Sequence, residues 1–429
     1  MKMFKSVSLM LFAAMASVFY GLGEKLNAAL FNYQAKQGMI LGVNTLTGLI
    51  PVIYEAVDRV SRELVGVIPG TTLDSTVDRA ALGQTVSSPV APASFASDIV
   101  PGVTAPNDGD QVIGKMDIVI SKSRAVPIRW NGAEIRGVNT GVGYINIFRD
   151  QVSQAIRTLV NEIEADVLLE ARRGASRAYG TPGTAPFGVV NDLTDSSEIL
   201  RIIEENGAQG LERSLVLSTN AMSNIRGKQA VLFRVNEAGT DALLRQGVLG
   251  DLHGSQVRQS AASKFVTKGT GAAYTTSGTA LPIGSIVIPL ITGAGTVLAG
   301  DSITFAGDLN KYVVAIGVGA PGSITLALPG LRVAIPAAAT AATVGASFTP
   351  SILFAKSAMV LAMRAPALPI DASGREADMA DDRLTIVDPL TGMSFELSMY
   401  RQYRQIRYEL ACTWGQRAVK AENIAILLG

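Results

Sequence analysis

Few side chains of this sequence could carry catalysis or bind a metal. The 429 residues include one histidine, His253, and one cysteine, Cys412. His253 has no second histidine and no neighbouring cysteine to complete a metal site. A single cysteine excludes an intramolecular disulfide and fits a reducing compartment. The sequence therefore predicts no metal site, no cofactor and no enzyme that depends on histidine.

Ser302 is the strongest candidate nucleophile, because the run Gly300-Asp301-Ser302-Ile303 resembles the nucleophile block of a family of serine esterases. Those enzymes need a histidine after the serine, whereas His253 precedes it. We therefore interpret the run as a turn that leads into a strand. The glycine-rich run GTPGTAPFG (residues 180–188) has no Gly-Lys-Ser/Thr and opens no evident helix, which favours a loop over a phosphate-binding site.

The remaining candidates are cations and aromatic residues that could contact another chain. Arg401, Arg404 and Arg407 are interleaved with tyrosines in the run YRQYRQIRY (residues 400–408). A nucleic-acid contact is one interpretation. The adjacent Glu409 and the near-neutral total charge favour an inter-subunit or solvated face. A second group of candidate inter-subunit contacts comprises Lys115, Lys122, Arg124, Arg129 and Trp130.

Composition favours a chain that buries much of its surface. Hydrophobic residues make up 48% of the sequence and charged residues only 17%, and the formal net charge is +1. A folded monomer normally keeps more charge on its exterior, so we expect a large part of this surface to meet other subunits. The small net charge argues against a dedicated nucleic-acid binder with a large basic field.

One long helix is expected to position these residues. From Ile145 to Ala178, apolar residues recur with a helical period, and no proline or glycine interrupts them before Gly174. About 30 helical residues would span roughly 45 Å, more than most compact domains need. A single apolar stripe places such a helix along one surface of the fold.

Two alternating apolar runs precede this helix, at residues 116–120 and 126–130. The polar SKSRA between them predicts a β-hairpin that projects from a domain, and Pro127 restricts the second strand to a sheet edge. Before it, residues 66–110 are rich in turn and breaker residues, which predicts an extended arm or a disordered linker.

The N-terminus permits two interpretations. Residues 1–20 have two lysines followed by an apolar run and small residues, as in a secretory signal peptide. The alternative is a retained N-terminal arm helix that continues through Leu22, Leu26 and Leu30. No other segment is apolar over the length that a transmembrane helix requires.

The second half of the chain changes character twice. Residues 190–262 predict a small α/β unit with helices near 198–206 and 219–228 and a further short helix from Thr240. Residues 264–350 are rich in small and β-branched residues, with strand-like runs at the spacing of a small sandwich or barrel. Helix and strand are expected to return at 354–363, followed by strands to the end of the chain.

Three stretches carry a resemblance to a known family: KMDIVISKSRAVPIRWNG (115–132), LVNEIEADVLLEARRGASRAYGTPGTAPFG (159–188) and FAKSAMVLAMRAP (354–366). With the order of the predicted elements, they resemble the major capsid (coat) proteins of tailed bacteriophages. The branch most similar is the one whose coat protein carries an inserted β domain. The resemblance covers about residues 40–429 in pattern.

This resemblance implies an α+β, HK97-like capsid fold with six parts. They are an N-terminal arm (1–110), an extended hairpin loop (111–144), a spine helix with the peripheral domain (145–189), an axial domain (190–263), an inserted barrel-like β domain (264–350) and a closing helix-and-strand set (351–429). The implied activity is self-assembly into pentamers and hexamers of an icosahedral head that encloses double-stranded DNA, without catalysis. Such a protein is assembled in the host cytoplasm and resides in the virion.

The implied partners are copies of the same chain, together with scaffolding and portal proteins and, in some heads, decoration proteins. Packaged DNA would be contacted only weakly and non-specifically, and no membrane is involved. Two other classes stay open at this point. One is an exported β-rich surface protein, if residues 1–20 are a cleaved signal peptide; the other is a hydrolase that uses Ser302.

Overall fold

The computed structural model describes residues 64–90, 112–138, 144–208, 212–229, 249–319, 321–374, 377–388 and 391–429, and the single positions 96, 98, 99, 101 and 210. The signal or arm segment 1–20 and the short helix expected from Thr240 lie outside these residues. The chain divides into two units. Of the described residues, the smaller unit contains 129–138, 144–147 and 402–407, and the larger unit contains the others.

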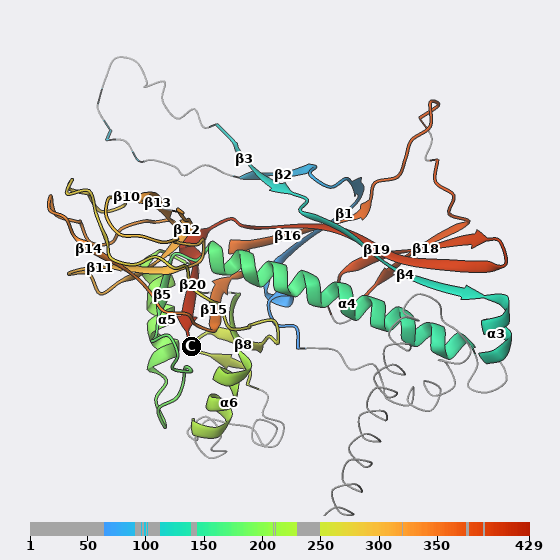
Figure 1. The fold of residues 1–429 in the computed structure, drawn as a ribbon, viewed down its shortest axis with the longest axis horizontal. Helices are drawn as coiled ribbons and strands as arrows, with labels where there is room; N and C mark the ends of the chain where they lie inside the picture. The colour runs from blue at the N-terminus through green and yellow to red at the C-terminus, as the bar shows by residue number, and fades with distance from the viewer. Residues whose placement is uncertain are drawn as a thin grey trace, which may run out of the picture. The chain divides into compact units, whose positions relative to one another are not determined.

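The predicted long helix is confirmed as α4 (Tyr144–Arg173, 30 residues), the uninterrupted green helix of Figure 1. Its buried stripe follows the helical period and includes Ala155, Ile156, Leu159, Val160, Ile163, Val167, Leu168 and Ala171. The helix ends five residues earlier than the predicted limit. At Gly174 a side chain would collide with Ala418, and the chain turns there into strand β5 (Arg177–Tyr179).

A six-stranded sheet has the order β1-β16-β19-β18-β17, with β4 also paired to β19. Its strands are β1 (Thr72–Ala80), β4 (Lys122–Asn131), β16 (Met359–Pro366), β17 (Asp382–Val387), β18 (Ser394–Gln402) and β19 (Gln405–Ala418). β4 pairs only with β19 among the described strands, so Pro127 lies on an edge strand as predicted. A short helix, α3 (Gly132–Val138), follows β4.

A twelve-stranded sheet has the order β7-β8-β6-β15-β20-β5-β12-β11-β14-β9, and β13 joins β10 to β12. Its remaining strands are β6 (Arg213–Leu217), β7 (Asp251–Leu252), β8 (Ser255–Gln259), β9 (Tyr274–Thr275), β10 (Val287–Leu290), β11 (Ser302–Phe305), β12 (Lys311–Ile316), β13 (Gly322–Leu326), β14 (Ala341–Val344), β15 (Pro350–Ala355) and β20 (Ile424–Leu428). The strands predicted for the inserted β domain therefore continue the sheet of the α/β unit, because β5 pairs with both β20 and β12.

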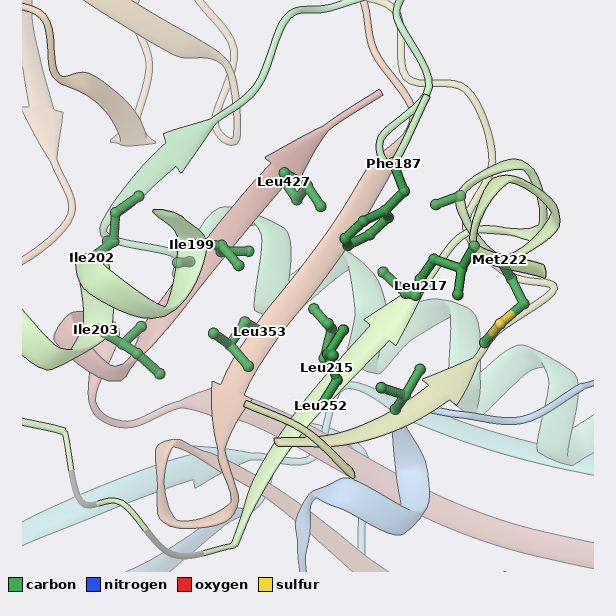
Figure 2. Close-up of a cluster of buried hydrophobic side chains, with 14 residues drawn as sticks. Phe187, Ile199, Ile202, Ile203, Leu215, Leu217, Met222, Leu252, Leu353 and Leu427 are labelled. Carbon is green, nitrogen blue, oxygen red and sulfur yellow. The ribbon is translucent and has the colours of Figure 1, made fainter. Parts of the chain in front are cut away.

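The core of the α/β unit lies between this sheet and two helices, α5 (Thr194–Glu205) and α6 (Thr219–Lys228). Figure 2 shows Ile199, Ile202 and Ile203 of α5 beside the strand residues Leu353 and Leu427. Phe187 and Met222 close the other end of the cluster. Ser218 caps α6 by accepting a hydrogen bond from the Ala221 amide.

Two expectations about the first part of the chain are wrong. The strands at 116–120 and 126–130 do not pair with each other. Instead β3 (Gly114–Val119) pairs antiparallel with β2 (Thr85–Val90), and β4 pairs with β19. Within the segment 66–110, which was expected to be an arm or linker, residues 72–80 and 85–90 form β1 and β2, and most of 91–110 lies outside the described residues. Each of the two strands pairs with a strand that is distant in sequence, although the short, charged SKSRA segment connects them directly.

The helix expected within residues 354–363 is also wrong. Strand β15, a single 3-10 turn at Lys356–Ala358 and strand β16 occupy this segment. All six residues of β15 are buried, and a continuous apolar run does not distinguish a buried strand from a buried helix. Among the described residues of 351–429 there are strands and 3-10 turns but no α-helix. The general α+β class is confirmed by the helices and sheets of the whole described chain.

Candidate assembly surfaces

The β2–β3 ribbon is a two-stranded sheet separate from the two larger sheets. Its register places Val86 opposite Ile118 and Ser87 opposite Asp117. An isolated pair of strands is marginally stable at best in water. Val112 and Ile113, which lead into β3, are 86% and 72% exposed. The ribbon thus combines open backbone edges with exposed apolar residues, the combination that favours pairing with another chain.

The root of this ribbon is fixed to the body of the subunit. Ile118 and Ile120 are buried in a small cluster with Ala80 and Ala362. The Ser121 amide donates a hydrogen bond to the Trp414 carbonyl at 2.9 Å. A side chain at Gly415 would collide with the backbone of Val119 and Ile120, so only glycine allows β19 to pass this closely.

Lys122 lies just beyond the root and is bound within its own subunit. Its Nζ is 2.8 Å from Glu162 Oε1 and 2.8 Å from Asp166 Oδ2, both on α4. It also lies 5.9 Å from the ring centroid of Trp414, whose Nε1 donates to Asp166. Burial opposes the charged form, but hydrogen bonds and charges of Asp166 and Glu162 outweigh it and raise the pKa of Lys122. This ammonium is therefore an internal contact between β4 and α4.

The other candidates in this region have different surroundings. Lys115 on β3 has a side chain that is 73% exposed and lies 3.9 Å from Asp117. Arg124 is exposed and reaches Glu162 at 3.3 Å. Arg129 is exposed, whereas Trp130 is fully buried and presents no side-chain surface to a neighbour. Inter-subunit contact remains a prediction for the exposed residues Lys115, Arg124 and Arg129, and the burial argues against Trp130.

Replacing Lys122 tests this assignment. We expect Lys122→Met to lower the free energy of unfolding by about 1–2 kcal/mol, because it leaves the Asp166 carboxylate without its cation in a partly screened site. Lys115→Met is the matched control, with a change within about 0.5 kcal/mol. Urea denaturation of both variants measures the difference. Equal effects would show that Lys122 has no special structural role.

A buried carboxylate at the middle of α4 was not singled out in the sequence. Glu164 is 2% exposed and accepts hydrogen bonds from the amides of Gly66, Val67 and Ile68 at 2.8, 2.8 and 3.0 Å. The hydroxyl of Ser260 donates a fourth bond at 2.7 Å. A sequence signal for its burial was present, because Glu164 lies one turn from Val160 and one turn from Leu168 on the apolar stripe. This residue joins the segment that enters β1 to the spine helix.

The three arginines near residue 404 lie on the β18–β19 hairpin. Tyr403 and Arg404 form its two-residue turn, and Arg404 has a φ of 56°. Tyr403 is 86% exposed, and the Arg404 guanidinium lies 5.5 Å from the centroid of its ring. Arg401 is exposed on β18, and Arg407 is partly buried on β19. The turn therefore presents an aromatic ring and a cation to solvent.

No catalytic arrangement is assembled from the candidate nucleophile. Ser302 is 4% exposed and lies on β11. His253 occurs in the turn between β7 and β8, with its Nδ1 3.0 Å from Ser196 Oγ. Within the described residues there is no group of three or more His, Cys, Asp or Glu that could hold a metal ion. In this same part of the chain, no helix has the length and apolar character to cross a membrane.

Cys412 provides a pH-dependent test of the packing around strand β19. It is 1% exposed on β19, and burial, with the negative charge of Glu162, raises the pKa of its thiol to about 12. The unfolded chain deprotonates first, so stability is full below pH 9 and falls as the pH rises from 9 towards 12. The slope is up to about 1.4 kcal/mol per pH unit. In Cys412→Ala this part of the decline should disappear, as measured by urea denaturation between pH 8 and 11.

No family model matches the sequence, and no curated protein matches it. Solved structures do. The chain is similar to the capsid structure of cyanophage P-SCSP1u (TM-score 0.46, 10% identity, 86% of this chain and 89% of that chain). It is also similar to a structure from Gordonia phage Cozz (0.43, 13%, 86% and 87%) and to the mature capsid of bacteriophage PhiM1 (0.42, 9%, 84% and 85%).

Proposed function

We propose that this chain is the major capsid protein of a tailed bacteriophage. In this role it assembles with copies of itself into pentamers and hexamers of an icosahedral head around double-stranded DNA. The observation that carries the proposal is the β2–β3 ribbon, which is rooted on the body by Ile118 and Ile120 but joins neither of the two larger sheets of the described residues. Such a ribbon gains stability when it lies on a neighbouring subunit.

Two further observations support self-assembly. Large apolar side chains are exposed at many places, including Val112, Ile113, Phe265, Leu309 and Met379. The charge of the chain is low and nearly balanced, which suits subunits that contact one another over large areas. The contacts with scaffolding, portal or decoration proteins that the sequence resemblance implies belong to this proposal as well.

Negative-stain electron microscopy of the expressed protein, alone and with the products of neighbouring genes, tests the proposal. We expect closed shells or ring-shaped capsomers. A protein that stays monomeric even with those products present would contradict the proposed function. That result would favour the alternative interpretation, an exported surface protein with residues 1–20 as its signal peptide.

A further inference from the structure

The described residues of the smaller unit carry an excess of positive charge that the proposed function does not by itself explain. Among its described residues are four arginines and one glutamate: Arg129, Arg136, Arg404, Arg407 and Glu134. Glu134 is 3% exposed and is used internally, since its Oε2 accepts from the Asn131 amide while Asn131 Oδ1 accepts from the Glu134 amide. Among the described residues of this unit, the one carboxylate is therefore withdrawn from solvent.

Two elements of the unit present the positive charge together. The Gly132 amide at the start of α3 donates to the Arg404 carbonyl at 3.4 Å, so α3 contacts the β18–β19 turn. Arg136 is exposed on α3, and Arg404 lies over the exposed ring of Tyr403. Tyrosine and arginine are the residue types enriched where protein interfaces have their strongest contacts. We call Arg136, Tyr403 and Arg404 the basic tip.

The chain also carries an acidic surface that combines exposed carboxylates with exposed apolar side chains. Asp381 and Asp382 are exposed and, within the residues that the structure describes, neither forms an ion pair. Their carboxylates accept only backbone amides, those of Arg401 and Arg383 respectively. Met379 beside them is 88% exposed and Ile370 is 69% exposed. Apolar side chains with a charged rim are typical of a surface that binds protein.

We propose that the basic tip of one subunit docks on the acidic segment Asp381–Asp382 of a second copy of the same chain. This inference rests on the proposed function, because it names a contact through which capsid subunits recognise each other. Charge complementarity supports a second copy, with the tip arginines facing unpaired carboxylates and Tyr403 packing on Met379. A nucleic acid is the less favoured occupant. One tip offers few cations, so its contribution to DNA binding would be small and strongly dependent on salt.

A charge-swap experiment on the full chain tests the docking. We expect Arg404→Glu and the double variant Asp381→Arg/Asp382→Arg each to lower the yield of closed particles about tenfold, because like charges then meet. The combination of all three substitutions should restore the yield to within about twofold of wild type. Lys264→Glu reverses an exposed charge outside both surfaces and serves as the control, with an unchanged yield.

The possible outcomes separate this inference from the proposed function. If wild type forms no particles, the proposed function fails. If wild type and Arg404→Glu form particles equally well, the docking contact is wrong and the capsid assignment stands. Normal particle numbers with reduced DNA content in Arg404→Glu would assign the tip to DNA and overturn the contact between copies. Arg404→Gln, which removes the charge without reversing it, provides a second variant, with an expected intermediate yield.

Discussion

Joining Ser87 to Asp117 through a two-residue Asn-Gly turn is expected to yield a folded, soluble subunit that closes no shells. The deletion removes residues 88–116 and keeps the opposed pairs Ser87–Asp117 and Val86–Ile118, so the new turn closes an existing register. Ile118 and Ile120 stay in their buried cluster, which keeps the root of the ribbon intact.

Two measurements check this prediction. Thermal unfolding should show a midpoint within about 2–4 °C of wild type, since the buried cluster around Ile118 and Ile120 is retained. Electron microscopy should show no closed particles. Lys420→Ala, which removes one exposed charge outside the ribbon, is the control and should still assemble. Closed shells of normal size from the shortened chain would show that the ribbon is not needed between subunits.

The largest loss of stability is expected from Glu164→Ala. The substitution leaves the amides of Gly66, Val67 and Ile68 and the hydroxyl of Ser260 without their acceptor in a buried site. Each buried unsatisfied donor costs about 1–3 kcal/mol and the costs are not additive, so we expect a total loss of about 3–5 kcal/mol. Glu164→Gln should lie between, because its amide oxygen still accepts while its NH2 group faces other donors.

Chemical denaturation and hydrogen exchange distinguish a local joint from general packing. In Glu164→Ala, the amides of residues 66–68 should exchange much faster while the central amides of α4 stay protected. Glu198→Ala removes a partly exposed carboxylate paired with Arg201 and serves as the control, with a change below about 1 kcal/mol. A loss in Glu164→Ala no larger than that of the control would contradict the role of this carboxylate.

The elements with strong local signals were predictable from the sequence. The spine helix has an uninterrupted apolar period, and the structure contains it over most of its expected length. The strand expected after the turn at Ser302 is found as β11 (Ser302–Phe305), and the described chain ends in a strand, Ile424–Leu428, as expected. In each case neighbouring residues alone determine the outcome, through apolar periodicity or a short apolar run between turns.

The pairing of strands was not predictable in the same way. β3 pairs with β2 across a long connection, whereas its nearest neighbour β4 pairs with β19 near the end of the chain. Close approaches such as that at Gly415 settle this choice, and they depend on residues almost 300 positions apart. The contacts of Lys122 also depend on residues distant in sequence, and for this reason the sequence predicted that Lys122 contacts another chain. Its carboxylate partners on α4 are brought to it only by the folded sheet.

Cryo-electron microscopy of assembled wild-type particles tests the central claim most directly. We predict a reconstruction in which each β2–β3 ribbon, from Thr85–Val90 and Gly114–Val119, lies on an adjacent subunit while its root remains beneath β19 of its own chain. A reconstruction in which every ribbon folds back on its own subunit, without contact to a neighbour, would contradict the account.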